Sequence, residues 1–78
     1  MRPVFVQLRC KPDKTYEVAD ELYKREIASE LYSTSGDYDL LMKVYIDDGV
    51  DIGKFVSENI ANVPGIRRSL TTLTFKAF

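Results

Sequence analysis

Apolar and polar residues alternate along the first segment of the chain. Over residues 3–10, every even-numbered position is apolar, whereas the odd-numbered positions are mixed. A period of two predicts a β-strand. Pro12 interrupts this pattern, and Asp13 is expected to cap a helix that runs from Tyr16 to about Lys24, where apolar positions recur at helical spacing.

Two further strands are predicted over residues 27–35 and 38–47, joined by Gly36-Asp37 as a tight hairpin. Glycine accepts the positive φ that such a turn requires. A two-residue loop fixes the register, so facing residues have numbers that sum to 73, and Glu30 then meets Lys43. The other expected pairs are Leu31 with Met42, Ile27 with Ile46, Ser33 with Leu40, Tyr32 with Leu41, and Ala28 with Tyr45.

A second helix is predicted from about Val50 to Asn62, with the acidic residues Asp48 and Asp51 near its start. It ends before Pro64, and residues 66–76 form a last strand. The order βαββαβ predicts a ferredoxin-like α+β sandwich with a four-stranded antiparallel sheet, of the dimeric α/β-barrel type. Residues 1–78 are expected to form a single ligand-binding domain.

Two helices can cover only one face of a four-stranded sheet. The expected covered face holds Val4, Val6, Leu8, Leu31, Leu40, Met42, Val44 and Ile46. The other face, called the open face below, carries large side chains among polar ones: Phe5, Tyr32, Leu41 and Tyr45. Such a surface favours a homodimer with sheet packed against sheet; the alternative is a lone domain with an amphipathic open face.

Composition removes several classes of function. The net charge is −1, so the positive field of a nucleic-acid-binding protein is missing, and the basic doublet Arg67-Arg68 is interpreted as a solvated strand end. Without histidine and with Cys10 alone, zinc sites and His-dependent nucleophiles are excluded. No apolar run approaches the roughly 20 residues of a membrane span. We therefore expect a cytoplasmic protein without cofactor or metal, which contacts neither nucleic acid nor membrane directly.

Asp37 and Asp39 flank Tyr38 directly after Gly36. A free amino acid needs an anion for its ammonium and N–H donors for its carboxylate, and an Asp beside a tight glycine turn supplies both. The alternative is structural, because Gly-Asp is ordinary hairpin chemistry and Asp39 could bond local backbone. Catalysis by the two carboxylates is disfavoured, since an unperturbed Asp is a poor general acid at neutral pH.

Four segments together resemble a known family: TSGDYDLLMKV at 34–44, FVSENI at 55–60, VPGI at 63–66 and SLTTLT at 69–74. They are similar to the effector-binding (RAM) domain of Lrp/AsnC-type transcription regulators, over nearly the whole chain. Those regulators place the domain after a helix-turn-helix, whereas the first strand here begins at Pro3, so a stand-alone form is expected. Lys24-Arg25-Glu26 stands where relatives often carry Pro-Gly, and Leu70 replaces a commonly polar residue.

The resemblance implies dimers assembled into a larger ring, often an octamer, with small amino-acid effectors bound where dimers meet. The chain has no His or Trp and no positioned polar cluster inside the sheet layer, so we do not expect an enzyme. Because a DNA-reading segment is not expected, we hypothesise that a full-length regulator sharing the interface couples effector level to transcription. The residues that match the family's effector pocket are Gly36, Asp37, Tyr38, Asp39, Ser69 and Thr71. Two alternatives stay open, a ligand-free structural oligomerisation module and a small cofactor-independent dimeric enzyme of the same fold.

Overall fold

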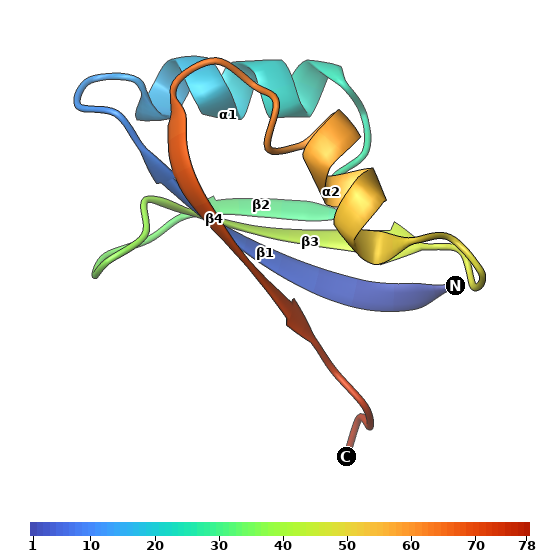
Figure 1. Ribbon diagram of the computed structural model, residues 1–78. Coiled ribbons are helices and arrows are strands. Elements are labelled where there is room, and N and C mark those ends of the chain that lie inside the picture. The colour runs from blue at the N-terminus through green and yellow to red at the C-terminus, as the bar shows by residue number, and fades with distance from the viewer.

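The computed structural model describes residues 1–78 and has the predicted βαββαβ order (Figure 1). Its elements are β1 (Arg2–Cys10), α1 (Thr15–Lys24), β2 (Glu30–Ser33), β3 (Leu40–Ile46), α2 (Ile52–Asn59) and β4 (Ile66–Leu73). The strands form one antiparallel sheet in the order β2-β3-β1-β4. Both helices lie on the same face of this sheet (Figure 1), so the ferredoxin-like architecture is confirmed. Neither helix is long and apolar enough to cross a membrane.

The hydrophobic core lies between the helices and the covered face. Val4, Val6 and Leu8 of β1 are fully buried, because the strand's alternation directs them all toward α1 and α2. β3 contributes its own alternate residues, and the helices add Val18, Leu22 and Val56. No polar side chain is buried, so apolar packing alone holds the two layers together.

No helix covers the open face (Figure 1). Tyr32 and Tyr45 are 54% and 44% exposed, whereas Phe5 and Leu41 are half-buried by their neighbours in the sheet. Leu70 of β4 lies opposite Gln7 of β1, so it joins these side chains on the open face. Five large side chains thus remain partly in contact with water across one sheet surface.

The predicted β2–β3 register is confirmed from Glu30↔Lys43 to Ser33↔Leu40. β2 is shorter than predicted, however, and Ile27 and Ala28 do not form their expected pairs with Ile46 and Tyr45. The Ser29 N–H donates to the carbonyl of Lys43 at 2.8 Å, and Lys43 is already the register partner of Glu30. Two consecutive residues therefore lie opposite Lys43, and the chain before them leaves the ladder.

The helix termini differ from the prediction in two places. Asp13 does not cap α1: it adopts a positive φ of 64°, and Lys14 is the N-terminal flanking residue, without a side-chain cap bond. Asp51 does cap α2 by accepting from the Lys54 N–H at 3.0 Å, so α2 begins after it. α2 ends at Asn59, three residues early, because side-chain amides occupy its last carbonyls: Asn59 donates to Phe55 and Asn62 to Glu58.

β4 ends at Leu73 rather than at residue 76. Leu73 lies opposite Val4, and the next residue of β1 is Pro3, which has no backbone N–H to donate. Residues 74–78 consequently leave the sheet as a C-terminal tail that runs away from the domain (Figure 1).

Candidate functional site

The loop between β2 and β3 is closed by hydrogen bonds of Thr34, the first residue after β2. The Thr34 N–H donates to the Asp39 carbonyl at 2.9 Å, and the Thr34 hydroxyl donates to the Tyr38 carbonyl at 2.9 Å. Gly36 has φ of 94°, as the turn prediction requires. The loop is therefore longer than two residues but keeps the predicted register, since 34 and 39 also sum to 73.

The two Asp residues of this loop have different roles. The Oδ2 atom of Asp39 accepts from the Cys10 N–H at 2.8 Å, which ties the loop to the end of β1. The Asp37 carboxylate has no hydrogen bond or ion pair within the chain; only its backbone carbonyl accepts, from the Arg9 Nη1 at 3.0 Å. Asp39 thus has the structural role that was the alternative interpretation, and Asp37 keeps its carboxylate available for a ligand.

Cys10 lies beside this attachment point and is buried. Burial raises the pKa of its thiol, the Asp39 carboxylate raises it further, and a hydrogen bond with Thr15 acts in the opposite direction. A thiol with a raised pKa is a poor nucleophile at neutral pH.

The loop forms one wall of a polar cleft of about 280 Å³, which we call the loop cleft. The main residues that line it are Gly36, Asp37 and Asp39 from the loop, Arg9, Lys11 and Asp13 from β1 and the turn after it, Thr15 from the start of α1, and Arg67 from β4. Both signs of charge are present, which matches the needs of a zwitterion. The cleft is open to solvent and has almost no apolar lining, so by itself it encloses only part of a ligand.

Three of the six predicted ligand residues do not line the loop cleft. The Tyr38 ring lies 5.3 Å from the guanidinium carbon of Arg68 instead, a cation–π contact that joins the loop to β4. Ser69 and Thr71 lie opposite Leu8 and Val6, so they belong to the covered face of β4. Within one chain, therefore, Ser69 and Thr71 are not brought together with the loop.

The sequence-based prediction missed the arginines at this end of the sheet. The register between β1 and β4 shifts here, because Arg9 lies opposite Arg68 but Cys10 lies opposite Ile66. Arg67 is the extra residue of this β-bulge. A second cavity of about 350 Å³ is lined by three residues only, Arg9, Arg67 and Arg68. The doublet at 67–68 was the available signal, but nothing in the sequence placed Arg9 beside it.

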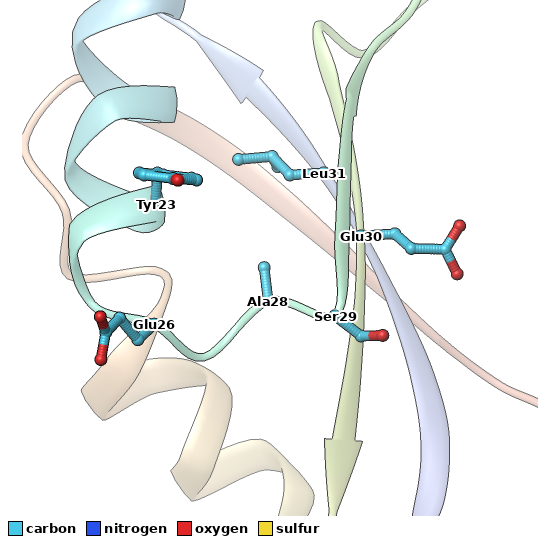
Figure 2. Close-up of a pocket in the computed structure, with 6 residues that line it drawn as sticks. All are labelled: Tyr23, Glu26, Ala28, Ser29, Glu30 and Leu31. Atoms are coloured by element: carbon cyan, nitrogen blue, oxygen red, sulfur yellow. The ribbon is translucent and has the colours of Figure 1, made fainter.

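The largest cavity, about 420 Å³, lies elsewhere, between the end of α1 and β2 (Figure 2). Tyr23 and Leu31 point toward each other across it, whereas the carboxylates of Glu26 and Glu30 point away from it in different directions (Figure 2). It holds no cationic side chain for a ligand carboxylate. The loop cleft is therefore the better candidate for an amino acid.

A charged network crosses the open face. The Glu30 carboxylate accepts from the Tyr32 hydroxyl at 2.5 Å and lies 3.4 Å from the Lys43 ammonium. That ammonium lies 5.2 Å from the centroid of the Tyr45 ring and 5.9 Å from that of Phe5. The Tyr32 hydrogen bond, then Lys43, lower the pKa of Glu30, and the same bond raises the pKa of Tyr32. The open face thus has fixed polar groups among its apolar side chains.

A family model described as the Lrp/AsnC ligand binding domain matches residues 3–78. Among curated proteins, the helix-turn-helix-type transcriptional regulator FL11 of Pyrococcus abyssi is 32% identical over 72 residues, covering 92% of this chain and 47% of FL11. The regulator LrpA of the same organism is 33% identical over 58 residues, covering 74% of this chain and 41% of LrpA. The chain spans about half the length of such relatives, which are transcriptional regulators and not enzymes.

Solved structures with a similar fold include members of this class of regulator. TTHA0845 from Thermus thermophilus superposes with a TM-score of 0.88 at 27% identity, covering 100% of this chain and 98% of that one. A transcriptional regulator from Neisseria meningitidis, solved as a complex with L-Met, shares the fold with a TM-score of 0.82 at 16% identity, covering 96% of this chain and 50% of that one. The chain therefore belongs to the Lrp/AsnC family and forms its ligand-binding domain.

Proposed function

We propose that this domain self-associates through its open face and binds a small amino acid in the loop cleft, at the place where subunits meet. The observation that carries the proposal is the free carboxylate of Asp37, which lines an open cleft together with Arg9 and Arg67. Its family membership supports a ligand-binding role, and the Neisseria complex supports the ability of this fold to hold an amino acid.

Self-association supplies what the isolated chain lacks. A domain of about this size buries only roughly 60% of the surface that its unfolded chain exposes, so burial of further apolar surface stabilises it. The open face offers that surface, and packing it against a second copy removes five large side chains from water. Higher assembly of such dimers, for example into an eight-membered ring, would bring a second chain to the loop cleft. Ser69 and Thr71 could enter the site from that chain.

Switching requires that the ligand bind one assembly state more tightly than the other. An amino acid held between dimers meets this condition, because its contacts exist only in the larger assembly. A full-length Lrp/AsnC-type regulator with the same open face could join such an assembly, which would connect the effector concentration to transcription. Co-expression with such a regulator and recovery of mixed oligomers tests this step, and recovery of homo-oligomers alone contradicts it.

Thermal unfolding in the presence of each of the twenty amino acids tests ligand binding. A ligand at 100 times its dissociation constant adds about 2.7 kcal/mol to the free energy of unfolding. For a domain of this size, each 1 kcal/mol raises the Tm by roughly 4–8 °C. We expect at least one amino acid to raise the Tm of the wild type and to have no effect on Asp37→Ala. Unchanged Tm values throughout would favour the ligand-free oligomerisation module.

A further inference from the structure

We infer that the ligand of the loop cleft is an acidic amino acid, whose second carboxylate binds the three arginines Arg9, Arg67 and Arg68. The inference rests on the proposed function and adds the chemical class of the ligand. It is carried by the second cavity, which those three guanidinium groups line alone.

The backbone places these three arginines close together, which lowers the stability of the fold. Arg9 and Arg68 are direct cross-strand partners, and like charges in that position are destabilising. Neighbouring residues of a regular strand point to opposite faces, so Arg67 and Arg68 would normally be separated. The bulge at Arg67 removes this alternation and leaves both beside Arg9. Bulges of this kind occur next to binding sites, where they redirect a side chain.

No acidic side chain of the chain forms an ion pair with the three arginines. The four ion pairs within 4 Å involve Lys14, Arg25, Lys43 and the N-terminal ammonium, and none involves Arg9, Arg67 or Arg68. Arg9 donates to the Asp37 carbonyl, and Arg68 lies against the Tyr38 ring, which fixes both guanidinium groups without removing their charge. A guanidinium fork binds a carboxylate with two parallel hydrogen bonds, so the cavity fits that group.

The two cavities are neighbours that share two lining residues. Arg9 and Arg67 line both the loop cleft and the arginine cavity, and the free Asp37 carboxylate lies in the loop cleft. Together the two cavities hold four cationic side chains and three carboxylates, an excess of one positive charge. A neutral amino acid leaves that excess in place, whereas an acidic amino acid, with its net charge of −1, cancels it. Asp37 would then hold the ammonium and the arginines the carboxylates.

Isosteric ligand pairs test the inference directly. Dissociation constants are measured by calorimetry for glutamate against glutamine and for aspartate against asparagine, at matched ionic strength because salt screens exposed charges. We expect one acidic amino acid to bind at least roughly tenfold more tightly than its amide, the effect of one charge-assisted hydrogen bond. Glutarate, which lacks the ammonium, should bind more weakly than glutamate.

Variants locate the effect in the arginines. Arg67→Gln should remove most of the preference for the acid, so that acid and amide bind the variant with similar affinity. The Arg67 side chain has no hydrogen bond or ion pair within the chain, so its replacement should leave the ligand-free fold unchanged. Arg2→Gln is the matched control, an exposed arginine of the same sheet at the far end of β1. Arg68→Gln gives a second test, with ligand-free melting used to check its folding.

The possible outcomes separate the two proposals. Selective binding of an acid that Arg67→Gln abolishes supports both. Equal or tighter binding of neutral amino acids overturns the acidic class and leaves the proposed function intact. Glutarate binding as tightly as glutamate overturns the assignment of an amino acid, because the ammonium then contributes nothing. Absence of binding by every amino acid overturns the proposed function and this inference together.

Discussion

Glu26 adopts a left-handed backbone conformation just after α1, with φ of 56°. Its N–H donates to the Tyr23 carbonyl at 3.1 Å, the arrangement in which helices usually end on glycine. A residue with a Cβ atom is strained by roughly 1–2 kcal/mol in this conformation. The position coincides with the segment where family members often carry Pro-Gly, so this chain keeps the turn but not its preferred residue.

Glu26→Gly should therefore raise the free energy of unfolding by about 1 kcal/mol, because the lost strain exceeds the added chain entropy. Urea unfolding followed by circular dichroism measures the change. Lys24→Gly, two residues earlier in the last turn of α1, is the control and should cost about 1 kcal/mol. A Glu26→Gly protein no more stable than the wild type contradicts this account of the turn.

Gly65 provides the opposite case, a glycine that is needed for space as well as for conformation. It has φ of 102°, and a Cβ atom there would lie 3.0 Å from Val18 Cγ2 and 3.2 Å from Lys14 Cβ. Gly49 has a similar φ of 87° with nothing within 4 Å. Gly49→Ala carries the conformational cost alone. Gly65→Ala should thus lower the free energy of unfolding by roughly 1–3 kcal/mol more than Gly49→Ala does. Equal midpoints in urea would rule out close packing of Gly65 on α1.

Replacement of Asp37 and replacement of Asp39 should have different effects on stability. Asp39→Ala leaves the part-buried Cys10 N–H without its acceptor, and a lost partner of this kind costs about 1–3 kcal/mol. Asp37→Ala removes a carboxylate that has no partner, so stability should change by no more than about 0.5 kcal/mol. Thermal melts without ligand measure both. A strong loss of stability in Asp37→Ala would show that its carboxylate is structural, and the loop cleft would lose its anion.

At the scale of elements, β2 is held to β3 by a charged pair as well as by backbone bonds. Folding lowers the pKa of Glu30 from 4.5, through Tyr32 first and Lys43 second. As the pH falls below that ordinary value, the unfolded chain takes up a proton before the folded chain does. The contribution of Glu30 to the free energy of unfolding is therefore fully present above about pH 4.5. It is lost as the pH falls through the lowered pKa of Glu30 in the folded state.

Glu30→Gln should flatten this decline. Urea midpoints measured between neutral pH and about pH 3 should fall less steeply for Glu30→Gln than for the wild type. Glu58→Gln, which removes an exposed carboxylate of α2 without an ion pair, is the control. Identical slopes in wild type and Glu30→Gln would mean that the network on the open face does not contribute to the pH dependence.

Local patterns were sufficient to predict the elements, the hairpin register and the two faces of the sheet. Alternation fixed which side of β1 is buried, and the Glu30–Lys43 pair confirmed the pairing. The bulge at Arg67 could not be predicted, because it depends on how β4 meets β1, which is distant in sequence. The different roles of Asp37 and Asp39 were hidden for the same reason, since the Cys10 N–H lies 29 residues before its acceptor.

At the scale of the whole molecule, one surface remains without a partner. The helices bury the covered face of β1 and β3, whereas the open face keeps Tyr32, Tyr45 and Leu70 each about half exposed. Leu70 departs from the polar residue that relatives commonly carry, and its place opposite Gln7 adds to this apolar surface rather than to the loop cleft. The proposed ligand site depends on this surface, because the loop cleft of one chain is open.

The molar mass of the purified protein tests the account most directly. Size-exclusion chromatography with light scattering should give twice the 8.9 kDa of one chain or a higher multiple. Leu41→Glu, which places a charge among the half-buried side chains of the open face, should reduce the mass to that of a monomer, whereas Glu58→Gln should leave the oligomer intact. A wild-type protein that stays at 8.9 kDa at high concentration contradicts the account.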